Sequence, residues 1–356
     1  MTDAHRASSL TRRKFLGGLA IGAGAGIAAL SYATAKDDRG PMDIQPIGIE
    51  SRPITHFLRS SPQQVRFGDL EFRGGLVLTS PSPHFGGWSG LVMSGDGRSL
   101  LSVSDEGSWL TAAVVYEGMR PTGLANGRIS PLLALRGRHL RNKREKDAEA
   151  VALLDGTLER GTLLIAFERE HRIGQFEIRN SELQAPSGYL ALPREAQRMQ
   201  ANQGIEALAV LQGGPLRGAV VAFAERLTRG SGYHTGWIWV RGVPQRFQLQ
   251  DVDGFNITDA AGLPDGGLIV LERYFRWTEG VKMRMRRLFP GEIVPGARVK
   301  GRMLMEADSG YEIDNMEGVA VHRGARGETV VSLISDDNFN HFLQRTVFLQ
   351  FTLAGA

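Results

Sequence analysis

The chain has 356 residues, of which 42% are hydrophobic and 22% are charged, and its 45 glycines exceed the usual share of about 7%. This composition is typical of a globular, turn-rich protein and excludes a disordered one. The sequence contains no cysteine, which excludes disulfides, zinc–thiolate sites, a cysteine nucleophile and a lipidated N-terminal cysteine.

Residues 1–35 have the three-part pattern of an export signal. Arg12 and Arg13 precede a Gly- and Ala-rich apolar run that extends to about residue 30, and Ala33 and Ala35 form an A-x-A cleavage site. The paired arginines indicate the twin-arginine kind. The alternative, a membrane anchor, is disfavoured because the run is shorter than the ~20 residues that span a bilayer. We therefore expect the twin-arginine export machinery as a partner, and a periplasmic or secreted mature protein with no stable membrane anchor.

Removal of this segment changes the charge of the protein. The whole chain has a formal net charge of +4, and residues 1–35 supply +3 of it through four basic residues and one acidic residue. The mature chain is therefore nearly neutral. Its charge does not support nucleic-acid binding.

Five phrases of similar sequence follow one another along the rest of the chain. They are WSGLVMSGDG (88–97), DAEAVALL (147–154), GIEALAVL (204–211), ITDAAGLPDG (257–266) and YEIDNMEGVAVHR (311–323). Each has a polar residue, then a small residue, then an apolar run. Aligned on the polar residues Ser89, Glu149, Glu206, Asp259 and Glu317, the phrases are 60, 57, 53 and 58 residues apart. A period in this range is typical of repeat architectures.

The repeats predict an all-β fold. Each phrase is followed by a turn and further short apolar runs, in groups of about four per repeat, and Gly, Asp and Pro residues separate the runs. This pattern predicts a β-propeller of four-stranded blades. Five repeats are counted, and residues 43–64 leave room for a degenerate sixth.

The last repeat ends after three strands, at FLQFTL (348–353). We expect a strand from residues 65–80 to supply the missing outer strand, because joining the two ends closes the ring and removes exposed sheet edges. The predicted organisation is a signal peptide (1–35), an N-terminal linker or strand (36–64) and a propeller domain (65–356).

A second set of acidic residues stands at the ends of the second runs: Glu168, Glu225, Glu272 and Asp336, with Asp105 or Glu106 in the first repeat. In an antiparallel hairpin, the start of one strand lies beside the end of the next. We therefore expect the pairs Glu149–Glu168, Glu206–Glu225, Asp259–Glu272 and Glu317–Asp336 at one mouth of the ring. Like charges across a ladder are destabilising, so these pairs indicate a specific role.

One interpretation is a divalent cation, with calcium expected, because hard oxygen ligands suit calcium or magnesium. The candidate metal ligands are Glu149, Glu206, Asp259 and Glu317, with Asp337 and Asn338 from ISDDNFNHF (334–342). The candidate catalytic residues are Glu168, Glu225, Glu272 and Asp336. A second interpretation is that some of these acids are protonated or act as acid–base groups with a raised pKa.

Arginines directly follow three of the acids: Arg169, Arg226 and Arg273. Planar guanidinium groups near a divalent cation suit a phosphate group, so these residues are candidates for substrate binding. Adjacent strand residues point to opposite faces. The alternative is therefore that the arginines pair with acids of neighbouring blades and serve only to hold the blades together.

At these residues the chain resembles the phytase-like family, described as "esterase-like activity of phytase". The resemblance lies in WSGL, DAEAVAL, NQGIEALAV, DNMEGVAV and ISDDNFN, and it covers roughly residues 65–353. It implies a propeller with functional Asp and Glu residues, and it suggests hydrolysis of phosphoesters or esters.

We therefore expect an exported, monomeric, metal-dependent hydrolase of small-molecule phosphoesters or related esters, with an acidic site at one mouth of the propeller. The alternative function is a non-catalytic propeller, stabilised by calcium, that binds a protein or glycan partner. No G-x-S-x-G, P-loop or H-E-x-x-H motif occurs in the sequence, so serine-hydrolase chemistry has little support.

Overall fold

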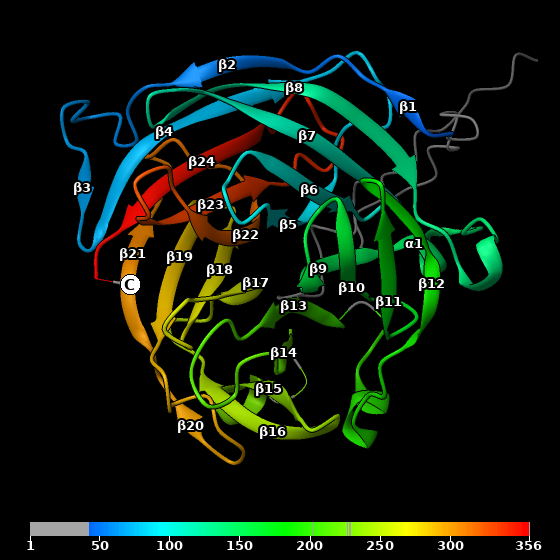
Figure 1. The fold of residues 1–356 in the computed structure, drawn as a ribbon. Helices are drawn as coiled ribbons and strands as arrows, with labels where there is room; N and C mark the ends of the chain where they lie inside the picture. Colours follow the sequence, from blue (N-terminus) through cyan, green and yellow to red (C-terminus); the bar gives the residue numbers. More distant parts are fainter. Residues whose placement is uncertain (1–42, 202, 226, 228, 356) are drawn as a thin grey trace, which may run out of the picture. The chain divides into compact units, whose positions relative to one another are not determined.

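Five β-sheets surround a common axis in the computed structural model, which describes residues 43–355 except 202, 226 and 228 (Figure 1). The predicted signal peptide lies outside the described residues. The sheets are the blades of a propeller, as the repeats predicted, and the phrases form the innermost strands of the blades. Among the described residues, no helix has the length and apolar character needed to cross a bilayer.

Blades 1 to 3 each contain four consecutive antiparallel strands. Blade 1 consists of β5 (Trp88–Met93), β6 (Ser99–Ser104), β7 (Ser108–Glu117) and β8 (Arg120–Pro131). Blade 2 consists of β9 (Ala148–Gly156), β10 (Arg160–Phe167), β11 (Arg172–Arg179) and β12 (Glu182–Tyr189). Blade 3 consists of β13 (Ile205–Val210), β14 (Val220–Ala224), β15 (Tyr233–Val240) and β16 (Val243–Gln250), and β20 (Arg298–Val299) runs parallel to β16.

Blades 4 and 5 depart from this simple order. Blade 4 consists of β17 (Asn256–Gly262), β18 (Leu268–Arg276), β19 (Gly280–Leu288) and β21 (Arg302–Ala307). Blade 5 consists of β22 (Met316–Arg323), β23 (Thr329–Ser335), β24 (Thr346–Leu353), β4 (Leu70–Thr79) and β2 (Glu50–Ile54), and β3 (Arg66–Phe67) also pairs with β4. The short helices are η1 (Leu135–Gly137), α1 (Lys143–Lys146), η2 (Arg194–Arg198) and η3 (Arg229–Ser231).

The N-terminal strand joins the last blade as expected, because β4 pairs antiparallel with β24 (Figure 1). The alternative of a sixth blade is wrong for the described residues. Residues 50–54 form β2, which pairs with β4 in blade 5, and β1 (Gln45–Pro46) pairs with β8 in blade 1. The segment that precedes residue 65 therefore covers the outer edges of two blades, where bare strands would invite association.

Apolar side chains fill the space between neighbouring blades, and each of the five core clusters combines residues from two adjacent sheets. The innermost strands approach one another closely near the axis. A Cβ atom on Gly90 would lie 2.9 Å from the backbone nitrogen of Val151 in the next blade. Glycine at position 90 is therefore required by this close approach between strands.

Each innermost strand begins with a register shift against its neighbour. In each blade, one residue of the innermost strand therefore has no partner across the ladder. From blade 1 to blade 5 these residues are Ser89, Glu149, Glu206, Thr258 and Glu317. A β-bulge of this kind re-aims a side chain and is common next to functional sites. We call the end of the ring where these bulges lie the mouth.

Candidate functional site

A second position of each blade also lies at the mouth. The residue before each bulge pairs with Ser104, Phe167, Ala224, Glu272 or Ser335 on the second strand. The residue that follows on the second strand is then Asp105, Glu168, Glu225, Arg273 or Asp336. Four of these five positions are acidic, and in blade 4 an arginine takes the place of the acid.

The alignment of the fourth repeat is therefore wrong by one residue. Thr258, not Asp259, occupies the bulge, and Glu272 pairs with Ile257, while Asp259 pairs with Leu271. The predicted pairing of Asp259 with Glu272 is wrong. The hydrogen-bond ladder sets which residues lie opposite one another. In this blade both acids stand one residue away from the positions that lie at the mouth.

Asp259 is fully buried and holds two blades together. Its carboxylate accepts hydrogen bonds from the backbone N–H groups of Ala260 and, in blade 5, Val319, both at 2.8 Å. The bond from Val319 ties the fourth blade to the fifth. The geometry thus gives Asp259 a role in blade packing and does not support it as a metal ligand.

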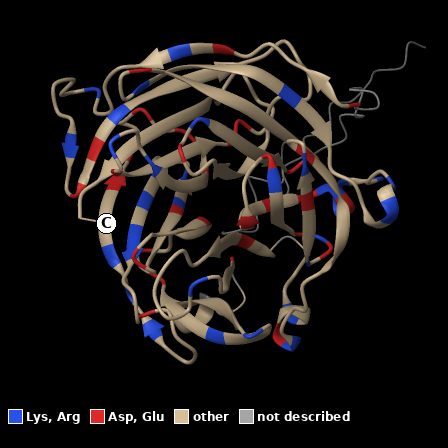
Figure 2. Cartoon of the chain, viewed as in Figure 1, with Lys and Arg blue, Asp and Glu red and all other residues tan. Residues whose placement is uncertain are grey.

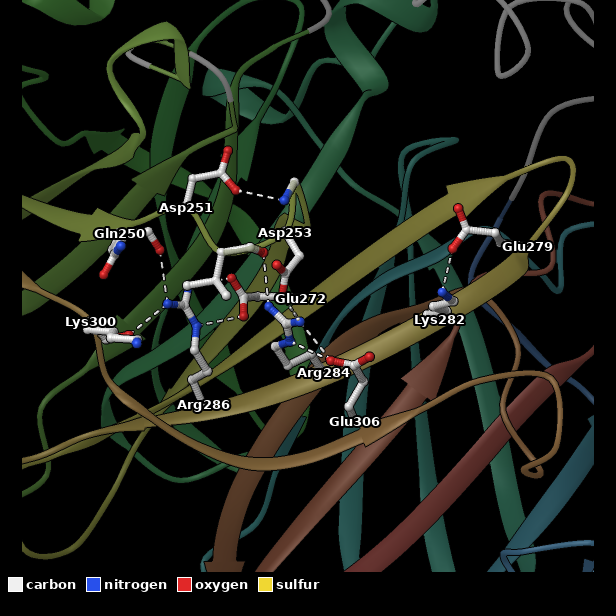
Figure 3. Close-up of polar contacts among 12 residues, drawn as sticks. Gln250, Asp251, Asp253, Glu272, Glu279, Lys282, Arg284, Arg286, Lys300 and Glu306 are labelled. Carbon is white, nitrogen blue, oxygen red and sulfur yellow. Dashed lines mark hydrogen bonds and ion pairs between the residues drawn. The ribbon is translucent and has the colours of Figure 1, made fainter.

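Glu272 is fully buried inside blade 4, where Arg286 donates to both of its carboxylate oxygens (Figure 3). Arg286 also donates to the backbone carbonyls of Gln250 (2.9 Å) and Lys300 (2.7 Å). Beside this pair, Arg284 donates to Glu306 and Asp253. Since Glu272 has its charge neutralised away from the mouth, it is not supported as a catalytic residue.

The acidic residues of blades 2 and 3 come together at the mouth (Figure 2). Two groups have one carboxylate oxygen from each member within 4.8 Å of the others: Asp147, Glu149 and Glu168, and Glu168, Glu206 and Glu225. Glu168 belongs to both groups. We call these five residues the acidic cluster. The predicted pairs Glu149–Glu168 and Glu206–Glu225 do lie together, and they join into a single cluster across the two blades.

Burial and repulsion by neighbouring carboxylates raise the pKa values of three members of the cluster, Glu149, Glu168 and Glu206. Burial is the main cause, and it raises the pKa of Glu168 to about 8, with Asp147 and Glu225 adding to the effect. The pKa values of Glu149 and Glu206 are raised well above their usual range by burial and then by neighbouring carboxylates. Such groups favour the protonated form unless a nearby cation compensates the charge of the carboxylate.

The chemistry of the donor set fits a hard divalent cation. All the ligand atoms are carboxylate oxygens, which calcium and magnesium prefer, and three of them can converge on one point in either group. Glu168 would be the shared ligand, joined by Asp147 and Glu149 in one group or by Glu206 and Glu225 in the other.

Blades 4 and 5 provide a different arrangement on the other side of the mouth. Arg273 Nε lies 3.2 Å from Glu317 Oε1, and Arg273 Nη1 donates to Asn315 Oδ1 at 2.7 Å. Burial raises the pKa of Glu317, and Arg273 partly offsets this effect. Glu317 thus pairs across blades with an arginine, which was the alternative interpretation of the arginines, and it does not join the acidic cluster.

Two further cations neutralise the acids of blades 1 and 2. Lys143 of α1 donates to Asp105 at 2.5 Å and lies 2.8 Å from Asp147, and Arg169 Nε donates to Asp147 at 2.6 Å. Arg169 therefore contacts an acid of its own blade. Arg226, the third arginine predicted to bind substrate, lies outside the described residues.

The three candidate residues in the loop after β23 lie in different environments. Burial, Asp105 and Glu317 together raise the pKa of Asp336, which lies at the mouth. Asp337 instead anchors the loop, because it accepts hydrogen bonds from the Thr346 hydroxyl (2.8 Å) and from the backbone N–H groups of Gly87 and Phe339. Asn338 is exposed and donates to the side chain of Gln344 at 3.1 Å.

Asp147 and Lys143 had no predicted role. Asp147 stands two residues before the bulge of its blade, at the position that Asn315 occupies in blade 5. A polar residue stands at this position in several repeats, and this pattern could have predicted a role for Asp147. No sequence pattern predicts a role for Lys143, because its contact with blade 1 depends on the path of the loop before β9.

Together the fold and the cluster define a five-bladed propeller with an acidic mouth. The sequence pattern of one family, Phytase-like, described as "Esterase-like activity of phytase", matches residues 83–339. This match covers more than half of the chain, which therefore belongs to the phytase-like family.

Among solved structures, the chain is similar to two propeller domains. One is the Cps50 (Swd1) β-propeller domain of Myceliophteria thermophila, at 11% identity and a TM-score of 0.38, covering 85% of this chain and 99% of that one. The other is the Pan2 WD40 domain of Neurospora crassa, at 9% identity and a TM-score of 0.38, covering 88% and 96%. No curated protein matches the sequence.

Proposed function

We propose that the protein is a metal-dependent hydrolase of phosphoesters or related esters, with calcium as the expected cation at the acidic cluster. The observation that carries this proposal is that Glu168 is shared by two groups of converging carboxylates. Membership in a family described by esterase-like activity supports ester hydrolysis. The pattern of residues 1–35 supports export by the twin-arginine route to the periplasm or beyond.

Different residues of the mouth would bind the cation, accept a proton and contact the substrate. A divalent cation at the acidic cluster would supply Lewis-acid polarisation of the ester and favour attack by water. Asp336, which also lies at the mouth, would accept a proton from that water in its ionised form. Arg273 is the one basic residue among the five second-strand positions, and it would face an anionic oxygen of a small-molecule substrate.

The second candidate is a non-catalytic propeller, stabilised by calcium, that binds a protein or glycan partner. The Arg273–Glu317 pair favours it, because this pair joins blades 4 and 5 at the mouth and so uses two mouth residues for blade packing.

A substrate screen would separate the two candidates. Purified protein would be assayed against phosphomonoesters, phosphodiesters, carboxyl esters and lactones, with calcium and with chelator. We expect turnover of at least one class, lost in chelator and restored by calcium, because the acidic cluster alone repels an anionic substrate. Absence of turnover in every class, with calcium present, would contradict the hydrolase and favour the binding module.

A further inference from the structure

Two apolar projections rise from the mouth side of adjacent blades. The β18–β19 hairpin continues beyond Arg273 to its turn at residues 277–279, and Figure 3 shows Glu279 and Lys282 at the end of the hairpin, away from Glu272 and Arg286. The second projection is the loop at residues 336–345, which begins at Asp336. Since Arg273 and Asp336 both lie at the mouth, both projections extend from it.

The tips of these projections expose large apolar side chains. Trp277 is 71% exposed, Phe342 is 94% exposed and Leu343 is 72% exposed. Phe275 is also exposed, and its ring packs edge-on against that of Trp277 with 5.7 Å between centroids. Such exposure is costly in water, and when large apolar residues gather on one side of a molecule they mark an interaction surface.

The second loop has a defined conformation that keeps its apolar residues exposed. The backbone N–H groups of Leu343 and Gln344 both donate to the carbonyl of Asn340 at 2.9 Å. The base of the loop is fixed by Asp337, which accepts a hydrogen bond from Thr346. Phe342 and Leu343 are therefore presented by a hydrogen-bonded turn.

We propose that the mouth of the propeller docks on a lipid surface through these two tips. Apolar side chains on separate convex tips suit a soft lipid layer, whereas a stable protein interface requires one continuous, complementary patch. Tryptophan and other aromatic residues favour the boundary between lipid and water. At the hairpin tip, Arg276 and Lys282 share the single carboxylate of Glu279, so the tip has an excess positive charge that complements anionic headgroups.

This docking would also define the substrate class, and that part rests on the proposed function. A mouth held against a lipid surface meets the polar headgroups of amphiphiles first. The substrate would then be an amphiphilic ester or phosphoester, whose headgroup enters the acidic mouth while its acyl chain stays in the lipid.

The distribution of tryptophan provides a direct probe of docking. Trp88, Trp109, Trp237 and Trp239 are buried, so Trp277 is the one tryptophan that a lipid can reach. The protein would be mixed, in calcium, with vesicles of ether-linked phosphatidylcholine containing about 30% ether-linked phosphatidylglycerol, which hydrolysis of acyl esters cannot alter. We expect a blue shift of Trp277 fluorescence and quenching by lipids brominated on their chains.

Variants would test the contribution of the tips. The double variant Phe342→Ser/Leu343→Ser is expected to weaken vesicle binding by at least about tenfold, because two large apolar side chains no longer leave water. The matched control is Val243→Ser. Val243 is 59% exposed but begins β16 at the end of blade 3 away from the mouth, so its replacement should leave binding unchanged.

Three results would overturn the proposal. They are absence of vesicle binding, binding without quenching of Trp277, and binding unaffected by the double variant. Self-association that the double variant abolishes, without vesicle binding, would assign the tips to contacts between copies and would also overturn it. If vesicles are bound as expected but no ester is hydrolysed, docking stands while the proposed function fails.

Discussion

Replacing Glu168 with glutamine is expected to lower kcat/KM by at least about 100-fold on the substrate that the screen identifies. Glu168 belongs to both groups of converging carboxylates, so its loss would weaken every arrangement of cation ligands in the acidic cluster. Glutamine keeps the size of the side chain but removes its charge. A catalytic carboxylate typically contributes about 10²–10⁴-fold to the rate, and the loss of a ligand also lowers affinity for the metal.

The matched control for this prediction is Glu177→Gln. Glu177 lies in the same sheet, on β11, where it is partly exposed and pairs with Arg179. Its partner across the ladder is Thr162, near the start of β10 and far from the mouth. Kinetics at saturating calcium would be measured for both variants. Equal activity of the Glu168→Gln variant and the wild type would show that Glu168 is not part of the functional site.

Replacing Arg286 with methionine is expected to destabilise the protein by about 3–5 kcal/mol, on the order of 10 °C in Tm. The change would leave the charge of Glu272 buried without its partner and would remove hydrogen bonds to the backbone of Gln250 and Lys300 (Figure 3). Urea denaturation, followed by the fluorescence of the buried tryptophans, would measure the free energy of unfolding.

A double variant distinguishes loss of an ion pair from loss of packing. Glu272→Leu/Arg286→Met removes both charges, so it should recover much of the stability lost in Arg286→Met, because a buried pair can often be replaced by apolar residues at little cost. A double variant less stable than Arg286→Met alone would refute this account of the pair. Activity per folded molecule should be unchanged, since neither residue lies at the mouth.

Much of the fold could be predicted from the repeated phrases. An acid or serine followed by a small residue and an apolar run recurs because every innermost strand has the same needs: a bulge at the mouth, close approach to its neighbours and two buried faces. The strand supplied by residues 70–79 could also be predicted, because the last repeat lacks an outer strand. The edge strands β1 and β2 could not, since two to five residues carry too little periodicity.

The fourth repeat shows where sequence reasoning fails. Asp259 and Glu272 have the right residue types at nearly the right places, and residue type alone suggested that they match the acids of other blades. The ladder instead puts Thr258 and Arg273 at the mouth. A shift of one residue turns a side chain to the opposite face of a strand, so an alignment of acids cannot replace knowledge of the register.

The acidic cluster itself was predicted only in part. The pairs in blades 2 and 3 followed from the antiparallel geometry of a hairpin. Their union into one cluster depends on the contact between blades 2 and 3, and the separation of Glu317 depends on Arg273. These relations between blades arise from packing around the axis, which no local pattern in the chain encodes.

Thermal unfolding at pH 5 and pH 9, in chelator and in calcium, tests most directly whether the mouth is a cation site. The pKa of Glu168 is about 8 in the folded protein, above the value of about 4.3 for an unfolded glutamate. A raised pKa contributes stability that is present below the unfolded value and is lost as the pH rises through the folded value. In chelator, Tm should therefore fall by several degrees between pH 5 and pH 9. Calcium should restore it at pH 9, where the cluster is ionised, and have little effect at pH 5. A Tm in chelator that is constant or rises with pH, without a calcium response at pH 9, would contradict the cation site.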